Sequence, residues 1–492
     1  MVSGVGRSVN GVAGRVAARG GAWTVAERLF SQVSQLAVFI VGARILGPAE
    51  FGVFALVSAV AFVLLRVAEL GWPSFVMNWS GNERVPRQVL TLALLSGAVV
   101  GAIALAATGM AAALGLGPDV VAVAALFSLW VALGPFAGAL HGLMVWRGQL
   151  VTASLCEGAG EAAALVVSIV SLLQGHGILA LAYGRLAYIG MRIGLSVLAT
   201  RAVPITDLHD APLGQMRGFS ISVVATRLVY ALRAHIGTFL VGLFLGPVAV
   251  GHYRAAERLT GAAAEVIGAP VEKIAWSYLR GARDAPDGGI GSALWADRTQ
   301  GFLHAVTVVS VPLFLWVALM SEEIVVGLIG PEWAPAALAA SLLALSRIPM
   351  TYGAAVEPAL ALAGEIRRMP GAMLLFLILA AALTTLAAPF GLLAVSGAQI
   401  AVGVAVFVVT LRLLERHAAI PREALLSGIA PVLLASLAAV VVALVLRMQG
   451  LGASWHPLAQ ALMIGLLSLP FYAAALLSLD GRARTALRSM AA

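Results

Sequence analysis

Apolar segments long enough to cross a lipid bilayer follow one another along the whole chain, with short polar turns between them. A transmembrane helix needs about 20 apolar residues to span the roughly 30 Å hydrocarbon core. Hydrophobic residues make up 61% of the sequence and charged residues only 11%, which leaves no stretch suited to a large water-soluble domain. The sequence therefore predicts an all-α integral membrane protein whose binding sites lie among its transmembrane helices.

Fourteen candidate transmembrane helices are separated by Gly-Pro turns or by loops that carry arginine or aspartate. They cover approximately residues 22–46, 50–76, 88–113, 119–146, 151–173, 177–200, 218–245, 248–279, 299–320, 334–360, 370–388, 391–411, 424–446 and 457–479. The residues before the first span lack the apolar core of a signal peptide. They predict either an interfacial helix, with valines at positions 5, 9, 12 and 16 on one face, or a disordered tail.

Arginine is distributed very unevenly between the two sides that this span count defines. With a cytoplasmic N-terminus, nineteen arginines fall in inner loops and tails, and only Arg447 falls in an outer loop. This asymmetry follows the positive-inside rule, and one miscounted span would destroy it. Both termini are therefore predicted to be cytoplasmic, and Glu322 and Glu323 to lie outside.

Several classes of protein are excluded by the residues that would carry their chemistry. The single lysine, Lys273, follows Glu272 rather than the glycine of a phosphate-binding loop, so ATP hydrolysis by that route is excluded. Cys156 is the only cysteine, and the eight histidines show no paired metal spacing. The arginines are scattered between apolar runs and form no basic stripe for nucleic acid. We expect no cofactor, no metal and no nucleic-acid partner.

A repeat with an offset of 199 residues relates the two halves of the chain. Residues 46–54 (LGPAEFGVF) match residues 245–253 (LGPVAVGHY), and in the preceding helix Ala26, Arg28 and Leu29 fall on Ala225, Arg227 and Leu228. Span one thus matches span seven, and both start on the same side of the membrane. The pattern predicts two parallel six-helix repeats, an arrangement known among secondary transporters.

These residues carry a resemblance to a known family. The resemblance rests on three segments: Glu27-Arg28-Leu29 with Ser31-Gln32, residues 43–52 (ARILGPAEFG), and a weaker match from Arg227 to Gly251. They resemble the polysaccharide transport family of flippases, within the multidrug/oligosaccharidyl-lipid/polysaccharide (MOP) exporter superfamily. The number of predicted helices, the absence of large loops and the coverage of nearly the whole chain fit this family as well.

The resemblance implies two six-helix lobes around a central cavity, with two extra helices at the C-terminus. It also implies a non-enzymatic flippase of the bacterial inner membrane that exports undecaprenyl-pyrophosphate-linked oligosaccharide units by alternating access. Its partners would be that lipid-linked substrate, membrane lipids and polysaccharide polymerase or assembly proteins. The expected parts are residues 1–20 (cytoplasmic tail or interfacial helix), 21–205 (N-lobe), 206–415 (C-lobe), 416–480 (last two helices) and 481–492 (cytoplasmic tail).

Arginine within the spans gives the candidate substrate site. A charge at the bilayer centre costs about 2.5–3.5 kcal/mol on insertion scales, so such residues face a cavity or a partner. Guanidinium groups stay charged at any depth and bind phosphate through paired hydrogen bonds. The candidates for a cationic cavity that binds diphosphate are Arg28, Gln32, Arg66, Arg185, Arg192, Arg227, Arg233, Arg254, Arg258 and Arg347.

Two readings of these charges stay open. Arg66 with Glu69, and Arg254 with Glu257 and Arg258, have the helical spacing of pairs that hold helices together. By contrast, the repeat places Arg28 and Arg227 at matching positions, where they could bind the pyrophosphate together. Glu157, Glu161 and Glu357 are candidates for binding a coupling ion, and each could instead be the partner of an arginine.

Other functions compete with polysaccharide export. A lipid II flippase also has fourteen spans and a cationic cavity, whereas a cation-coupled multidrug exporter of the same superfamily usually has twelve spans. A membrane polysaccharide polymerase or ligase would need a substantial outer loop, and the longest here, near residues 321–333, is short.

The predicted topology can be tested by labelling single cysteines in a Cys156→Ser background. A cysteine at position 322 should react with an impermeant maleimide added outside, and one at position 283 only after the membrane is opened. Labelling at position 322 from the cytoplasmic side alone would contradict the fourteen-span topology.

Overall fold

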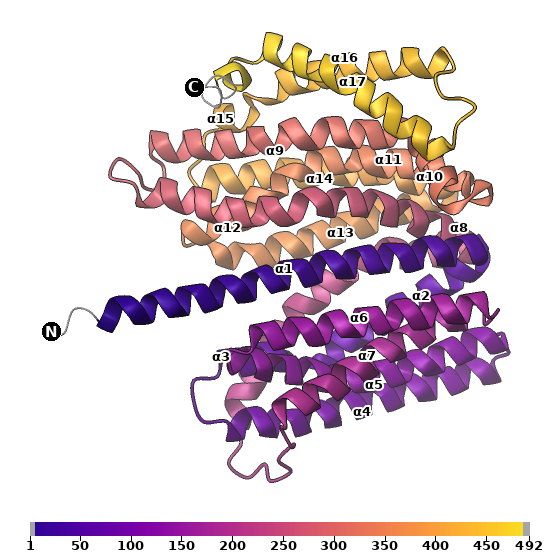
Figure 1. Ribbon diagram of the computed structural model, residues 1–492, viewed down its shortest axis with the longest axis vertical. Coiled ribbons are helices and arrows are strands. Elements are labelled where there is room, and N and C mark those ends of the chain that lie inside the picture. The colour runs from indigo at the N-terminus through magenta and orange to yellow at the C-terminus, as the bar shows by residue number, and fades with distance from the viewer. Residues whose placement is uncertain (1–4, 486–492) are drawn as a thin grey trace. The chain divides into compact units, whose positions relative to one another are not determined.

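The computed structural model describes residues 5–485, with side chains from Trp23 onward except at positions 266, 269, 270, 272 and 273. Regular structure in this part of the chain is helical throughout (Figure 1). The first helices are α1 (Val5–Ile45), α2 (Pro48–Glu69), α3 (Trp72–Asn78), α4 (Arg84–Ala113), α5 (Pro118–Trp146), α6 (Leu150–Leu173), α7 (Leu179–Thr200) and α8 (Leu213–Asp284). The all-α membrane fold is confirmed.

The later helices vary in length, and short 3-10 segments lie in some of the connections between them. They are α9 (Ala293–Leu319), α10 (Ser321–Ile329), α11 (Pro335–Met350), α12 (Val356–Leu362), α13 (Met369–Ala387), α14 (Leu392–His417), α15 (Arg422–Leu426), α16 (Ile429–Met448) and α17 (Pro457–Leu479). The 3-10 segments are Pro331–Trp333, Thr351–Ala355, Ile366–Arg368 and Ala388–Phe390.

Internal contacts divide the chain into two compact units, with the division after His235. The first unit holds α1 to α7 and the start of α8, and the second holds the remainder. The lobe boundary expected at residues 205–206 rests on the repeat rather than on contacts, and it stays a prediction. The division falls inside α8, so the start of this helix packs with the first unit.

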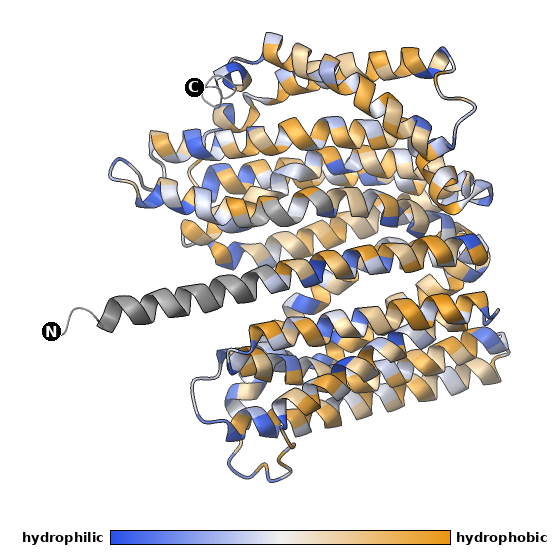
Figure 2. Ribbon diagram, viewed as in Figure 1, coloured by the Kyte–Doolittle hydropathy of each residue, from blue (hydrophilic) through white to orange (hydrophobic). Residues whose placement is uncertain are grey.

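Ten stretches of the described chain are long and apolar enough to cross a membrane. Apolar residues predominate along them (Figure 2). The other expected spans lie in α1, in α7, which carries Arg185 and Arg192, and in residues 334–360, where a 3-10 segment separates α11 from α12. Two expected spans are joined within α8. The protein is a multi-pass membrane protein, and the count of fourteen stays a prediction.

The predicted turn at Gly246-Pro247 is confirmed by the backbone of α8. Gly246 has φ 81° and ψ −179°, outside the helical region, and glycine adopts such a positive φ readily because it has no Cβ. A Cβ on Gly237 would lie 2.5 Å from the Tyr253 hydroxyl. In a straight helix these two residues would be about 24 Å apart along the axis. The chain therefore folds back at Gly246, and α8 is a helical hairpin.

Loops that the arginine pattern assigned to one side of the membrane lie together in the first unit. Arg84 Nη2 is 2.8 Å from Asp207 Oδ2, and Arg87 Nε donates to the Val203 carbonyl at 2.9 Å. Arg147 Nη1 donates to the Thr200 carbonyl at 2.7 Å. The loops before α4, before α6 and before α8 therefore meet at one end of this unit, as the predicted topology requires.

In the second unit as well, residues assigned to the same side of the membrane contact one another. The predicted outer arginine, Arg447, is ion-paired with Glu322 and Glu323, the residues predicted to lie outside. Arg482, predicted to be inside, pairs with Asp297 of α9 at 2.9 Å. Each assigned side is thus internally consistent. Which side faces the cytoplasm stays a prediction.

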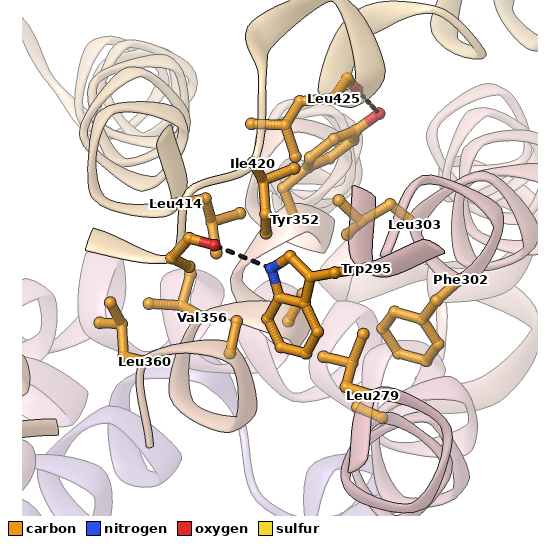
Figure 3. Close-up of a cluster of buried hydrophobic side chains, with 14 of the residues drawn as sticks. Leu279, Trp295, Phe302, Leu303, Tyr352, Val356, Leu360, Leu414, Ile420 and Leu425 are labelled. Atoms are coloured by element: carbon orange, nitrogen blue, oxygen red, sulfur yellow. Dashed lines mark hydrogen bonds between the residues drawn. The ribbon is translucent and has the colours of Figure 1, made fainter. Parts of the chain in front are cut away.

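A core around Trp295 fixes one end of the second unit (Figure 3). The indole is fully buried, and its Nε1 donates to the Ala418 carbonyl at 2.8 Å. Tyr352 OH donates to the Leu425 carbonyl at 3.1 Å. These bonds satisfy backbone groups in the irregular segment between α14 and α16 that would otherwise be buried without partners.

Small residues let α4 and α5 pack with their backbones in contact. Gly97 and Gly101, four residues apart on α4, both face Ala132 of α5. A Cβ on Gly97 would lie 2.1 Å from the Ala132 carbonyl oxygen. Small residues with this spacing are typical of helix interfaces in membranes, where close packing replaces the hydrophobic effect as the driving force.

Gly97→Ala should therefore destabilise the first unit. Overpacking a close contact costs about 1–3 kcal/mol, and we expect a lower unfolding temperature in detergent, measured by tryptophan fluorescence. Gly109→Ala on the same helix is the control, because a Cβ there meets nothing within 4 Å. Equal unfolding temperatures for the two variants would show that the α4–α5 contact is not close.

Candidate functional site

A polar network centred on Glu157 of α6 lies within the helices of the first unit. Arg192 Nη2, from α7, is 2.5 Å from Glu157 Oε1. Tyr188 OH, one turn away on α7, donates to Glu157 Oε2 at 2.5 Å. His141 Nδ1, from α5, lies 3.3 Å from Oε1. Three side chains from two neighbouring helices thus surround one largely buried carboxylate.

The network continues along α6 to Glu161, one turn further on. Gln35 Nε2, from α1, donates to Glu161 Oε1 at 3.0 Å, and Arg185 of α7 acts electrostatically on this carboxylate. Gly160 makes the approach of α7 possible, because a Cβ there would lie 3.0 Å from the Tyr188 ring. Glu161 is buried and has fewer direct donors than Glu157.

Glu157 and Glu161 differ in their ion pairing, and therefore in how readily each carboxylate can bind another ion. Removing one partner of a buried ion pair typically costs about 3–5 kcal/mol, so Glu157 and Arg192 are fixed to each other as a link between α6 and α7. Glu161 forms no comparably short ion pair in the described structure. Its carboxylate is therefore better suited to exchange a small ion.

A second cluster joins α2, α3 and α8 through Glu69. Arg66 Nη1 and Arg227 Nη1 lie 2.8 and 3.1 Å from the same oxygen, Glu69 Oε2. Arg227 Nη2 also donates to Ser74 Oγ at 2.9 Å. The Glu69 side chain is 10% exposed, whereas those of Arg66 and Arg227 are 39% and 29% exposed. Two accessible guanidinium groups therefore share one buried carboxylate, which leaves a local surplus of positive charge.

Arg28, the residue that the repeat pairs with Arg227, has different neighbours from those of Arg227. Its side chain is exposed on α1, next to Glu27, whose carboxylate accepts a hydrogen bond from Ser31 at 2.9 Å. Gln32, one turn further along, is half-buried. Arg28 and Arg227 both belong to the first unit.

Arg185 and Arg233 are half-buried in the first unit. The Arg185 guanidinium lies 5.7 Å from the centre of the Phe62 ring. That ring in turn stacks on His235 at 5.8 Å and meets Trp130 edge-on at 5.1 Å. The aromatic face adds stabilisation for the Arg185 cation beyond its attraction to Glu161.

In the second unit, three candidate arginines lie on α8 and α11. Arg254 is ion-paired with Glu257, one turn along α8, and Arg347 of α11 acts electrostatically on Tyr253 beside that pair. Arg258 is half-buried on the same helix. Glu357, expected deep in a span, is exposed at the start of the short helix α12.

Three contributors to these clusters were not singled out from the sequence. Ser74 binds Arg227, His141 contacts Glu157, and Trp130 packs on Phe62. The first pair is separated by 153 positions in the chain. All three contacts join side chains on different helices, which no spacing rule within one helix relates, so the sequence carried no signal for them.

Comparison with known proteins places this arrangement in a family. The profile of the polysaccharide biosynthesis protein family matches residues 41–338, which is more than half of the chain. No curated protein matches.

Solved structures share the fold. The lipid II flippase MurJ, in an inward closed conformation, is similar over 92% of this chain and 98% of its own, with a TM-score of 0.71 and 12% identity. A multidrug resistance MATE transporter of the MOP superfamily is similar in its inward-facing conformation over 78% of this chain and 95% of its own, with a TM-score of 0.62 and 14% identity. Identities this low establish the fold alone. The profile match shows that the chain belongs to the polysaccharide biosynthesis protein family, and these structures show that it has the fold of the MOP superfamily.

Proposed function

We propose that the protein is a flippase that moves an undecaprenyl-pyrophosphate-linked oligosaccharide across the bacterial inner membrane by alternating access. The family match supports a role in polysaccharide biosynthesis, and the MOP fold supports transport. The observation that carries the proposal is the pair of accessible arginines at Glu69. The substrate leaves chemically unchanged, so no catalytic residue is assigned.

The charge balance at Glu69 fits a diphosphate. One carboxylate neutralises one of the two guanidinium groups, so Arg66 and Arg227 together retain a positive charge. Guanidinium donates five N–H groups, and each of these arginines has donors left after its contacts to Glu69 and Ser74. A diphosphate accepts several charge-assisted hydrogen bonds at once. An uncharged drug would gain nothing from this cluster.

The other arginines divide into two groups under this proposal. Arg192 is paired with Glu157 of the neighbouring helix α6, and Arg254 with Glu257 of its own helix, and we assign both to structural ion pairs. Arg28 with Gln32, and Arg185, Arg233, Arg258 and Arg347, are half-buried or exposed and remain proposed substrate contacts. Arg28 and Arg227 are the pair that the repeat selects for binding the pyrophosphate.

Substitution of Arg227 tests the site. Arg227→Ala should lower the initial rate of flipping about tenfold or more, because a hydrogen bond to a charged group contributes about 1.5–3 kcal/mol. The flipping rate of Arg227→Lys should lie between those of Arg227→Ala and the wild type, since the charge remains but paired hydrogen bonding is lost. The measurement is flipping of a fluorescent lipid-linked oligosaccharide in proteoliposomes, with Arg28→Ala assayed in parallel.

Arg367→Ala is the matched control, because its side chain is 78% exposed in the 3-10 segment Ile366–Arg368. It should flip at the wild-type rate. A well-folded Arg227→Ala protein that also flips at the wild-type rate would overturn the proposed site. Efflux of cationic drugs at a rate similar to that of the lipid-linked sugar would instead favour a multidrug exporter.

We further propose that Glu161 binds the coupling ion. Its buried position and its hydrogen bond from Gln35, with no short ion pair among the described residues, support exchange of a proton or sodium ion, whereas Glu157 is held by Arg192. Glu357 is a weaker candidate because its side chain is exposed on α12 rather than buried among helices. Coupling through Glu161 would explain transport without nucleotide hydrolysis.

Glu161→Gln should abolish the acceleration of flipping by a pH or sodium gradient and leave the rate without a gradient largely intact. The neutral amide keeps the shape of the carboxyl group but cannot release a proton. Glu357→Gln serves as the comparison and should keep the acceleration. If Glu161→Gln responds to both gradients as the wild type does, the coupling site lies elsewhere.

A further inference from the structure

A groove with a volume of about 520 Å³ lies within the second unit, apart from the arginine clusters. Its floor is the last part of α9, including Leu315 and Leu319, and its walls are α11 and α16. Both of these helices pack against α9. The start of α10, with Glu322, closes one end.

Most of the groove is apolar. Ala337 and Leu338 of α11 face Val440 of α16 across the floor of leucines. On this wall the lining runs from Ala334, the residue before α11, to Ser341, and seven steps of helical rise correspond to about 10 Å. Leu338 is exposed, so the groove is open to the surface of the unit. Its walls suit the glycerol and first methylene groups of a lipid.

The closed end of the groove is charged. Arg447 Nη1 donates to the Leu319 carbonyl at 3.3 Å, Nη2 lies 3.2 Å from Glu322 Oε2, and Nε lies 2.8 Å from Glu323 Oε1. One cation therefore meets two carboxylates. Arg447 and Glu322 line the groove itself.

The carboxylates of Glu322 and Glu323 differ in exposure and in hydrogen bonding. The Glu323 side chain is only 9% exposed, and its second oxygen, Oε2, has no hydrogen-bond partner among the described residues. The Glu322 side chain is 65% exposed at the rim. The charged end thus has a net negative charge, together with an arginine that has N–H donors to spare.

We propose that this groove binds phosphatidylethanolamine. The lipid phosphate accepts hydrogen bonds from Arg447, and the primary ammonium group donates to Glu322. The glycerol and acyl chains lie along the apolar walls. α9 ends at Leu319 and α16 at Met448, so the charged end lies where these helices leave the hydrocarbon and a lipid headgroup would be found.

Other lipids fit this end less well. An anionic phosphatidylglycerol, or a lipid-linked diphosphate, brings negative charge without an ammonium group and is repelled by two carboxylates. Phosphatidylcholine has a quaternary ammonium group with no N–H to donate. Only an amine-bearing zwitterion complements both the arginine and the carboxylates.

Lipid competition on the full-length protein tests the proposal. Native mass spectrometry of the detergent-solubilised chain with an equimolar mixture of palmitoyl-oleoyl phosphatidylethanolamine and phosphatidylglycerol should show about tenfold preference for the ethanolamine lipid, the ratio for one charge-assisted hydrogen bond. Glu322→Gln should reduce this ratio to about one, because the rim carboxylate is lost. Soluble phosphoethanolamine should not compete, because it has no chains to occupy the groove.

Two further variants make the result specific. Ser341→Phe should lower retention of the ethanolamine lipid by filling the groove without changing its charges. Arg422→Gln removes the partner of Glu415 at 2.6 Å, an exposed pair outside the groove, and should leave the ratio unchanged. Equal retention of both lipids by the wild type, or a wild-type ratio in Glu322→Gln, would overturn the proposal. So would an equal loss of preference in Arg422→Gln.

Discussion

Charges placed among apolar helices need partners, and this requirement governs the internal arrangement of both units. Hydrocarbon offers no water to solvate a guanidinium or carboxylate group, so each must find a partner from a neighbouring helix, face a cavity, or reach the interface. Glu157 with Arg192, and Glu69 with Arg66 and Arg227, are the clearest results. These pairs fix which faces of α2, α6, α7 and α8 meet.

Close packing between small residues supplies the rest of the association between helices. Gly97 and Gly101 bring α4 onto α5, and Gly160 brings α6 onto α7 at the height of Tyr188. The second contact matters for chemistry as well as packing, because it holds the Tyr188 hydroxyl against Glu157. In a membrane, where burial of apolar area does not itself drive helices together, such contacts determine the geometry of polar clusters.

The numbers of arginines and glutamates in a cluster distinguish structural clusters from candidate binding sites. Glu157 is matched by Arg192, and further donors saturate it. Glu69 is outnumbered by two arginines, and Arg447 is outnumbered by two glutamates. The proposed occupants follow this difference: an anionic pyrophosphate of a lipid carrier for the first cluster, and an amine-bearing zwitterionic headgroup for the second.

The sequence by itself determined the all-α membrane class and the turn at Gly246, and it predicted which loops share a side of the membrane. These follow from local quantities: the length of apolar runs, the count of arginines and the backbone freedom of glycine. Local spacing also gave Arg66 with Glu69 and Arg254 with Glu257, each one helical turn apart. It did not give Ser74 or Glu69 as partners of Arg227, nor Arg447 with Glu323, because those contacts join residues more than a hundred positions apart. It also placed Glu357 within a continuous span, where the structure has a 3-10 break and an exposed side chain. Tertiary structure decided these points, since only the packing of distant helices sets which charges share a carboxylate.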